Sequence, residues 1–358
     1  MTILCLCREE HHWKLIPGYA QAFRRLGMEF ICVDDSIPFD APIEEVVRRS
    51  GVTPSAIFHF ESAHPLFPIG LERCEVPTVC FHPDTYAFTE RRIRWSSPFD
   101  HVAVFHPGYV ERFAKGGHAG AFLLPHAVRR EFFDGRELDR NFELGWVGQT
   151  SGPFYQARAE WLPKLAKEFK TNDWSRKYTV KEVAETYRRS KIVVNIGRDD
   201  FPQDANLRVF EVLASGALLL ASLPTELEEL GFTEGTHFVG YRNPTELRQL
   251  VRSYLEDEAA RSRIANAARE LVLKEHTYDK RAGRILDRLA AARGAKQAPA
   301  RTWSDSRARL VALDFYAAHG LMQCAAAQFR RIAGRGFRET MEGASLLTRA
   351  WWRSIRAR

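Results

Sequence analysis

The stretch from Asn195 to Ser222 reads NIGRDDFPQDANLRVFEVLASGALLLAS, and it decides the fold prediction. An apolar run at Lys191–Ile196 leads into it and predicts a buried strand. A polar loop with Gly197 follows, and a helical spacing then runs from Asn206 to Ser215. Gly216 ends this helix, because glycine readily adopts the left-handed conformation that closes many helices. Ligands of open α/β sheets bind where strands end and such loops begin, so this stretch predicts a binding site as well as a fold.

The same alternation of short apolar runs and amphipathic stretches extends in both directions along the chain. It is typical of a doubly wound parallel sheet covered by helices. We predict strands at Ile3–Cys7, Glu29–Val33, Ala56–Phe60, Thr78–Phe81, His101–Phe105, Ala121–Leu124, Glu143–Val147, Lys191–Ile196, Ala217–Ala221 and His237–Val239. We predict helices at Tyr19–Leu26, Ile43–Ser50, Gln156–Phe169, Lys181–Arg189, Asn206–Ser215, Pro244–Leu255, Glu258–Glu275 and Tyr278–Arg293. The fold class is therefore α/β, with two successive Rossmann-like units.

The length of 358 residues also favours two domains, because one hydrophobic core rarely grows beyond about 250–300 residues. A polar segment, Arg129–Asn141, interrupts the pattern and marks the first boundary. We expect a Rossmann-like domain at residues 1–135 and a second one at 141–278. A crossover helix at 279–294 and a basic helical extension at 295–358 complete the predicted organisation.

The composition indicates an ordinary globular protein of the cytoplasm. Apolar residues make up 45% and charged residues 27% of the chain, and no apolar run approaches the roughly 20 residues of a membrane-spanning helix. Ile3–Cys7 is followed at once by Arg8, Glu9 and Glu10, so it predicts a buried strand rather than a signal peptide. The six cysteines are scattered without a zinc spacing or a disulfide framework, which favours reduced thiols in a cytosolic protein.

The net charge of +7 lies in the extension. Residues 301–358 hold eleven arginines, no lysine and four acids, so the preceding 300 residues are neutral overall. A linker-like segment at 294–300 precedes them, and Trp351 and Trp352 lie near their end. Two interpretations stay open: the extension lies on an anionic membrane surface, or it packs on the body as an extra helical layer. A nucleic-acid partner is not expected, since no recognisable module is present.

Arg208 and Glu211 are the strongest candidates for ligand contacts. Arg208 lies in the first turn of a predicted helix, where free N–H groups and the helix dipole favour phosphate, and its planar fork suits a diphosphate. Glu211 lies one turn further on the same face and can accept two hydrogen bonds from a vicinal diol. The alternative is an ion pair on the helix surface, which the spacing alone does not exclude.

The segment Asn206–Ala217 resembles the signature of GT-B glycosyltransferases, a fold with two facing Rossmann-like domains. It looks most similar to the family 1/4-like group related to the spore-coat maturation protein CgeB. In these families two glutamates stand eight positions apart, one for the donor sugar and one for the ribose. Glu211 matches the ribose ligand, whereas Gln203 stands where the first glutamate is usual. The resemblance thus implies that Glu211 binds ribose and that Gln203 and Asp204 meet the sugar.

Other segments follow in the order of the family. Leu144–Ser151 resembles the first strand and phosphate loop of the donor domain, and Leu123–Phe133 resembles its linker, with Arg129 in place of the usual acid. Residues 244–278 resemble its closing helices. The resemblance therefore implies donor contacts from Gly148, Gln149, Thr150, Ser151, Arg158, Gln203, Asp204, Asn206, Arg208 and Glu211.

In the first half, His82 and Asp84 follow a predicted strand. The pair could act as acid and base or hold sugar hydroxyls; alternatively Asp84 stabilises a turn and His82 caps the strand. Gly18, in the predicted loop at 17–19, is a candidate contact for acceptor or phosphate because glycine permits close approach. His11 and His12 have no partner that would make a metal site, and no Asp-x-Asp motif is present, so no metal and no cofactor are expected.

The resemblance implies transfer of a hexose from a nucleoside diphosphate sugar to an acceptor hydroxyl, with retention of configuration and without a metal. Surface polysaccharide, glycolipid and protein glycan all remain open as acceptors. Two rival functions are a sugar-nucleotide epimerase of the same fold and a non-catalytic scaffold. The scaffold would bind membrane or a partner through the Arg- and Trp-rich extension.

Overall fold

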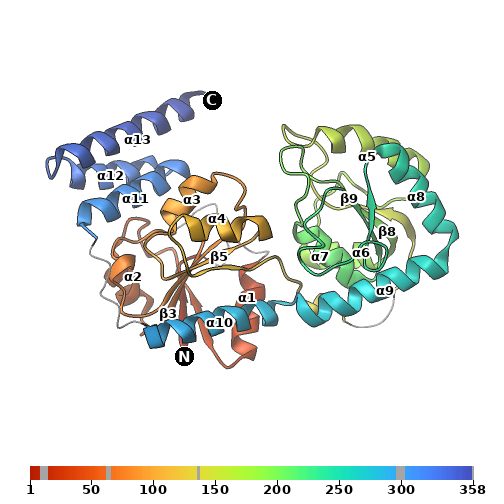
Figure 1. Ribbon diagram of the computed structural model, residues 1–358, viewed down its shortest axis with the longest axis horizontal. Coiled ribbons are helices and arrows are strands. Elements are labelled where there is room, and N and C mark those ends of the chain that lie inside the picture. The colour runs from red at the N-terminus through yellow and green to blue at the C-terminus, as the bar shows by residue number, and fades with distance from the viewer. Residues whose placement is uncertain (9–14, 62–65, 135–137, 296–302, 357–358) are drawn as a thin grey trace. The chain divides into compact units, whose positions relative to one another are not determined.

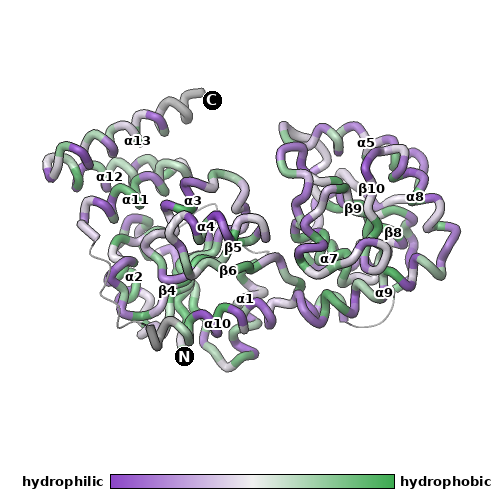
Figure 2. Tube along the Cα trace, in the orientation of Figure 1, coloured by the Kyte–Doolittle hydropathy of each residue, from purple (hydrophilic) through white to green (hydrophobic). Residues whose placement is uncertain are grey.

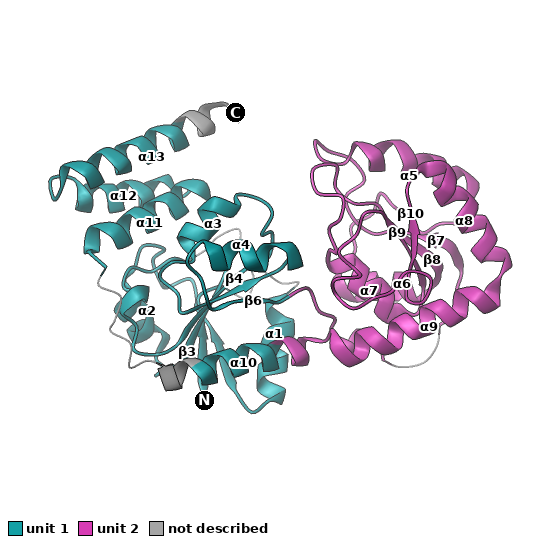
Figure 3. Ribbon diagram, viewed as in Figure 1, with its two compact units in different colours: residues 1–124, 282–358 teal, residues 125–281 magenta. Residues whose placement is uncertain are grey.

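The computed structural model describes residues 1–8, 15–61, 66–134, 138–295 and 303–356, with the backbone alone described at 292–295 and 352–356. It divides into two compact units (Figure 3). Unit 1 consists of Met1–Leu124 together with Ala282–Arg358, and unit 2 is Pro125–Arg281. This division differs from the predicted one, because the basic extension belongs to unit 1 and the crossover helix begins in unit 2 and continues in unit 1.

Unit 1 is built on a six-stranded sheet in the order β2-β1-β3-β4-β5-β6, and all its strand pairs are parallel. The strands are β1 (Thr2–Cys5), β2 (Glu29–Cys32), β3 (Ala56–Phe60), β4 (Thr78–His82), β5 (His101–Val104) and β6 (Ala121–Leu123). All six predicted strands of this half are confirmed to within two residues at each end, because each is a short apolar run; β1, β3, β4 and β5 are almost fully buried, whereas β2 and β6 at the two edges are partly exposed. The strand order reverses between β1 and β3, the place where open α/β sheets bind ligands.

Helices cover this sheet (Figure 1). They include α1 (Ile16–Arg25), α2 (Ile43–Ser50), α3 (Thr89–Trp95), α4 (Val110–Lys115) and the latter part of α10 (Tyr278–Ala295), with 3-10 turns η2 (Leu71–Arg73) and η3 (Pro107–Tyr109). On α1, Phe23 stacks on Phe30 of β2 at 5.2 Å between ring centroids. The predicted loop at 17–19 is instead part of α1, since Pro17 is compatible with the first turn of a helix.

The extension forms α11 (Asp305–Ala318), α12 (Met322–Ile332) and α13 (Phe337–Arg356). In α11 the buried side chains Leu313, Phe315 and Tyr316 share one hydrophobic core with Leu4 of β1 and Ile57 of β3. α12 and α13 pack on α11 (Figure 1). The second interpretation of the extension, an added helical layer, is thereby confirmed for α11.

A buried carboxylate attaches α11 to α3. Asp314 accepts hydrogen bonds from Trp95 Nε1 at 2.9 Å and from Arg91 Nη2 at 2.5 Å, and Arg94 lies 3.5 Å away. Tyr316 donates its hydroxyl to the carbonyl oxygen of Phe67 at 2.8 Å. Because a buried charge is costly unless it is paired, these contacts fix the helix in one position.

Unit 2 has a four-stranded parallel sheet in the order β10-β9-β8-β7. Its strands are β7 (Phe142–Gly145), β8 (Ser190–Asn195), β9 (Leu218–Ser222) and β10 (Val239–Tyr241). Its helices are α5 (Gln156–Glu168), α6 (Val180–Arg188), α7 (Leu207–Ser215), α8 (Pro244–Glu256), α9 (Glu258–Glu275) and the start of α10, with the 3-10 turn η4 (Arg130–Phe132). The predicted helices and strands of this half are all present.

Three remaining sequence predictions concern exposure and chemistry. No helix in the described part of the chain is both long and apolar enough to span a membrane. All six cysteines are free thiols. His11, His12 and most of the predicted linker at 294–300 lie outside the described residues.

Candidate functional site

The candidate site lies in unit 2, where the loops after β7 and β8 meet the amino end of α7. The loop after β8 is closed tightly: Gly197 donates its backbone N–H to Ser222 Oγ at 3.2 Å. A Cβ at Gly197 would lie 2.3 Å from the carbonyl oxygen of Pro202, so only glycine fits this turn. The turn leads to Asn206, which precedes α7.

Arg208 is held at the centre of this site. Its Nε donates to the carbonyl oxygen of Val147 at 2.9 Å, and its Nη1 donates to Asn195 Oδ1 at 2.8 Å. Its guanidinium also lies over the ring of Trp146, 3.9 Å from the centroid. Three contacts from two strand ends thus fix the plane of the guanidinium, which leaves little conformational entropy to lose when an anion binds.

Gly148 lies against the remaining nitrogen of that side chain. Its φ is +145°, and an added Cβ would come within 2.2 Å of Arg208 Nη2. The loop at Gly148–Ser151 therefore passes close to the guanidinium, and Gly148, Gln149 and Ser151 are exposed while Thr150 is half-buried. Such a glycine lets the backbone of a loop approach a bound phosphate closely.

Arg158 brings a second guanidinium to the same place. It is buried, donates to the carbonyl oxygens of Ile196 at 2.9 Å and Gln149 at 3.3 Å, and lies 5.2 Å from the centroid of Trp146. Burial and the neighbouring charge of Arg208 lower the pKa of Arg158 to about 9. Two like charges held together on one indole favour an anionic ligand between or beside them.

Two helices begin at this edge of the sheet, and only one of them has a side chain that caps its first N–H groups. At the start of α5, Asp199 accepts the backbone N–H groups of Gln156 at 2.6 Å and Ala157 at 3.3 Å. At the start of α7, the side chain of Asn206 makes no capping hydrogen bond and instead donates to Asn195 Oδ1 at 3.2 Å. The start of α7 therefore lacks a capping side chain, whereas the start of α5 has one. The positive end of the α7 dipole lies in the turn that carries Arg208.

Glu211 lies one turn beyond Arg208 on α7 and is half-buried. The charges of Arg208 and Glu211 both act on the phenol of the buried Tyr187. Burial raises the pKa of Tyr187 above its usual value, the charge of Arg208 opposes the rise, and the charge of Glu211 adds to it. The pairing of Arg208 with Glu211 on one ligand stays a prediction from their spacing on α7.

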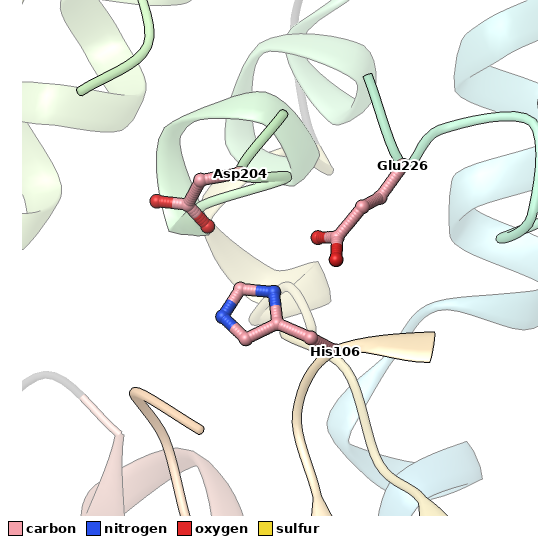
Figure 4. A group of neighbouring side chains, drawn as sticks. All are labelled: His106, Asp204 and Glu226. Atoms are coloured by element: carbon pink, nitrogen blue, oxygen red, sulfur yellow. The ribbon is translucent and has the colours of Figure 1, made fainter. Parts of the chain in front are cut away.

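Gln203 and Asp204 lie in the turn before α7, beside a residue that the sequence analysis did not include. The backbone carbonyl oxygen of Gln203 accepts the backbone N–H of Glu226 at 3.0 Å, and the buried Glu226 carboxylate accepts the backbone N–H of Ala205 at 3.5 Å. One carboxylate oxygen of Glu226 lies within 4.8 Å of one of Asp204 (Figure 4). His106, also drawn there, belongs to unit 1.

Four residues of this site were not among the contacts predicted from the sequence: Trp146, Asn195, Arg198 and Glu226. Asn195 had a signal, since it is the polar residue that ends an apolar run. Arg198 holds Asp200 with two hydrogen bonds of 2.8 and 2.9 Å. Trp146 had no such signal, because its contacts with two arginines form only when the strands and helices of unit 2 assemble.

In unit 1 the predicted pair of His82 and Asp84 does not form. His82 is fully buried, with Nδ1 at 2.5 Å from Glu61 Oε2 and Nε2 at 2.8 Å from Ser96 Oγ. Asp84 is exposed, and its carbonyl oxygen accepts a hydrogen bond from Arg92 Nη1 at 2.5 Å. The reason is the strand geometry: β4 directs His82 into the core toward the end of β3, while Asp84 follows in the turn.

Glu61, directly after β3, is the centre of this buried network. Arg92 donates to both its carboxylate oxygens at 2.8 Å, and His319 Nε2 lies 3.3 Å away. Burial alone would raise the pKa of Glu61, but hydrogen bonds from His319 and His82 and the charge of Arg92 outweigh it and hold the pKa well below its usual value. Burial lowers the pKa of His82, and this effect outweighs the hydrogen bond and the charge of Glu61, which raise it.

Gly18 is buried within α1, and its N–H donates to the carbonyl oxygen of Leu15 at 3.0 Å. Its backbone therefore takes part in the helix start rather than in an open loop. The predicted contact of Gly18 with acceptor or phosphate stays a prediction.

Comparisons with known proteins agree with this architecture. Residues 136–287 match the sequence model of a family described as glycosyl transferase-like. A search of curated proteins gives no match. Among solved structures, the chain is similar to HepE of Anabaena in complex with UDP and glucose, at 12% identity and a TM-score of 0.57 over 81% of this chain and 100% of that chain.

It is also similar to a glycosyltransferase from Rickettsia africae, at 11% identity and a TM-score of 0.55 over 81% of this chain and 98% of that one. Sucrose-phosphate synthase from Thermosynechococcus elongatus gives 12% identity and a TM-score of 0.57 over 82% and 100%. The chain therefore has the GT-B fold, with two parallel-sheet α/β units. The part that matches the glycosyl transferase-like family nearly coincides with unit 2. The narrower resemblance to CgeB stays a prediction.

Proposed function

We propose that this protein is a glycosyltransferase whose unit 2 binds the donor, a nucleoside diphosphate sugar. The observation that carries the proposal is the pair of guanidinium groups, Arg158 and Arg208, packed on Trp146 beside Gly148 and the uncapped start of α7. A diphosphate is the ligand that such a site recognises best, since it accepts hydrogen bonds from planar forks and from a helix start.

The roles of the remaining residues follow from that position. As the bond to the sugar breaks, negative charge develops on the leaving diphosphate, and the fixed charge of Arg208 stabilises it without reorganisation. The carboxylate of Glu211 accepts hydrogen bonds from the two ribose hydroxyls, and Gln203 and Asp204 contact the sugar. Asp84, the exposed member of the predicted pair, orients the acceptor hydroxyl. We further propose that a hexose is transferred with retention and without a metal ion.

The choice of nucleotide draws on the neighbouring structures. HepE was solved in complexes with UDP and with UDP-glucose, so uridine diphosphate is the first nucleotide to test. The acceptor would be a hydroxyl of a surface polysaccharide, a glycolipid or a protein glycan, and the expected compartment is the cytoplasm.

A thermal-shift screen with UDP, GDP, dTDP, CDP and their sugar conjugates, with and without EDTA, tests the donor class. A ligand that binds only the folded protein raises its melting temperature, so we expect a selective rise for one nucleotide that EDTA leaves unchanged. A rise that EDTA abolishes would instead require a metal, for which the neighbouring carboxylates of Asp204 and Glu226 would be the first candidates. No rise with any nucleotide would contradict the proposal.

The substitution Glu211→Ala tests the ribose contact. We expect it to weaken nucleotide binding about tenfold or more, the loss of hydrogen bonds to a charged group, as measured by titration calorimetry. Glu270→Ala, at an exposed position of α9, is the matched control and should bind as the unchanged protein does. Equal affinities for both variants would remove Glu211 from the donor site.

One observation favours a second candidate function, a non-catalytic scaffold. Gln203 replaces a glutamate that is usual in the families this sequence resembles, so the chain could bind a nucleotide sugar without transferring it. Release of nucleotide from the sugar conjugate that binds, followed over time with glycan and lipid-linked acceptors, separates the two: turnover above that of a heat-inactivated sample excludes the scaffold.

A further inference from the structure

The amide of Asn195 joins two segments of the donor site. Asn195 ends β8, a mainly apolar strand in the interior of unit 2 (Figure 2), and its own exposure is 3%. Its Oδ1 accepts two hydrogen bonds, from Arg208 Nη1 at 2.8 Å and from Asn206 Nδ2 at 3.2 Å. Its backbone carbonyl oxygen accepts the hydroxyl of Tyr241 at 3.0 Å. These contacts hold one buried amide oxygen against the guanidinium of Arg208.

The groups that orient the two site arginines are uncharged. The guanidinium groups of Arg158 and Arg208 both contact the neutral ring of Trp146. The oxygens that accept their hydrogen bonds are the backbone carbonyl oxygens of Val147, Gln149 and Ile196 and the amide oxygen of Asn195. These contacts fix the positions of both arginines, but none of them cancels a charge.

The buried Arg92 of unit 1 has the opposite arrangement. Both carboxylate oxygens of Glu61 accept hydrogen bonds from Arg92 at 2.8 Å, so the charge of this arginine is compensated within the protein. An aspartate in place of Asn195 would compensate Arg208 in the same way, because its carboxylate accepts the same hydrogen bonds as the amide oxygen. The neutral amide therefore sets the charge of the donor site.

The charge left on the two arginines acts within the protein. Burial and the charge of Arg208 lower the pKa of Arg158 to about 9. Tyr155 and Asp204 each raise this pKa by less than Arg208 lowers it, and Arg198 lowers it slightly further. Like charges held together in a buried place destabilise the ligand-free protein, and an anion that contacts both removes that cost.

We propose that Asn195 is a positioning residue of the donor site, and that its neutral amide orients Arg208 while leaving the charge of both arginines available to a diphosphate. The inference rests on the proposed function and adds a requirement on the ligand. A ligand with several negative charges fits the pair of arginines, so a nucleoside diphosphate binds much more tightly than its nucleoside. A carboxylate at position 195 would repel that ligand and occupy the guanidinium of Arg208.

Titration calorimetry of Asn195→Asp tests this inference, with UDP, GDP, dTDP and CDP and the four corresponding nucleosides as probes. For the diphosphate that binds the unchanged chain, we expect the affinity to fall about tenfold or more, while the affinity for its nucleoside stays within about twofold. The melting temperature of the ligand-free variant should be equal or higher, because the new carboxylate offsets the repulsion between the two guanidinium groups.

Asn195→Ala separates this role from a purely structural one. The substitution removes the acceptor without adding a charge, so the diphosphate affinity should lie between those of the unchanged chain and Asn195→Asp. Its melting temperature should be the lowest of the three, because Arg208 and Asn206 each lose a buried hydrogen bond. A residue that only supports the fold would give the opposite order of affinities, since aspartate keeps those hydrogen bonds and alanine does not.

Asn243→Asp is the matched control. Asn243 is exposed and caps α8, where its side chain accepts the backbone N–H of Glu246 at 2.9 Å. Aspartate caps a helix as well as asparagine does, so this variant adds the same charge to unit 2 without a change in fold. It should bind every probe as the unchanged chain does.

Four outcomes would overturn the inference alone, in each case with the unchanged chain binding a diphosphate. The first is equal diphosphate affinity for Asn195→Asp and the unchanged chain. The second is an equal loss of diphosphate and nucleoside affinity, the third is tighter diphosphate binding by Asn195→Asp than by Asn195→Ala, and the fourth is an Asn195→Asp variant that does not fold. If the unchanged chain binds none of the four diphosphates, the proposed function itself fails and this inference fails with it.

Discussion

At the scale of single residues, Trp146 and Gly148 are the positions on which the donor site depends most. The indole carries two guanidinium groups, and the glycine leaves room for one of them. Neither residue offers a charge or a nucleophile, so both act by positioning Arg158 and Arg208. Donor binding therefore depends on the shape of the site as well as on its charged residues.

Gly148→Ala tests this dependence on shape. The new Cβ would lie 2.2 Å from Arg208 Nη2, and the backbone would keep a φ of +145° that other residues rarely adopt. Arg208 cannot move aside without losing its bonds to Val147 and Asn195. We expect nucleotide affinity to fall about tenfold or more, with the melting temperature nearly unchanged because the loop is exposed.

The control for this substitution is Gly283→Ala. An added Cβ there meets nothing within 4 Å, and the residue lies within α10, where alanine is a better helix former. Calorimetric titration with the nucleotide chosen by the screen should give the same affinity for this variant and the unchanged chain. The interpretation of Gly148 is wrong if Gly148→Ala also binds normally.

The buried histidines of unit 1 make its stability depend on pH. Burial lowers the pKa of His59 to about 3, whereas an unfolded chain has a histidine pKa of about 6.5. A group whose pKa is lower in the folded state contributes stability that is present above the unfolded pKa and is lost as the pH falls. The free energy of unfolding should therefore decrease between pH 6.5 and 3, by at most about 1.4 kcal/mol per pH unit for this one group.

His59→Phe should reduce that slope. The ring of His59 packs among Phe67, Phe99 and Phe315, with centroids 5.1–5.7 Å apart, so a phenyl ring suits its surroundings. Urea unfolding of both proteins at pH 7 and pH 5 gives the comparison. Identical losses of stability on acidification would show that His59 does not titrate as expected. Glu61 loses its contribution only at lower pH, because its folded pKa is already depressed.

At the scale of helices and strands, the sequence allowed most of the fold to be predicted. α9 begins and ends at the predicted residues, and the apolar runs locate every strand. β10 begins two residues later than predicted, because its pairing with Leu220–Ser222 of β9 sets its register. Periodicity reports which side of an element is apolar, but not which residues of a neighbouring strand set its limits.

The contacts that the sequence did not indicate are those between distant segments. Glu61 meets Arg92 and His319 across separations that no motif connects, so the prediction paired His82 with the nearest carboxylate instead. α11 did carry a signal: Leu310, Val311, Ala312 and Leu313 are consecutive and apolar. A helix that is apolar all round is a buried helix, and this pattern could have shown that α11 belongs to the core.

Two deletions separate the roles of the helices in the extension. Removal of the residues after Ala298 takes α11 away and exposes the core that Leu313, Phe315 and Tyr316 fill. We expect unit 1 to aggregate or to lose its cooperative unfolding, because large buried side chains lose their partners. Removal of the residues after Gly334 takes away α13 alone, and should leave a protein that still unfolds cooperatively, because α11 continues to fill the core of unit 1.

Calorimetry and nucleotide titration of both deletions provide the measurements. Unit 2 is made of one continuous segment, Pro125–Arg281, so the nucleotide affinity should be kept in both. A cooperative, fully stable protein after the longer deletion would show that α11 is dispensable and that its burial contributes little.

At the scale of the whole molecule, the order of segments along the chain has a consequence for protein synthesis. Unit 1 is assembled from two parts that the whole of unit 2 separates, and the hydroxyl of Tyr316 binds a carbonyl oxygen 249 residues earlier. Strands β1 to β6 therefore leave the ribosome long before the helix that covers their apolar face. Unit 2 can fold as soon as its last residues emerge, since domains fold as units during translation. Until α11 is synthesised, the apolar surface that it will cover stays exposed on the nascent sheet, and slow translation of the intervening segment would lengthen that exposure.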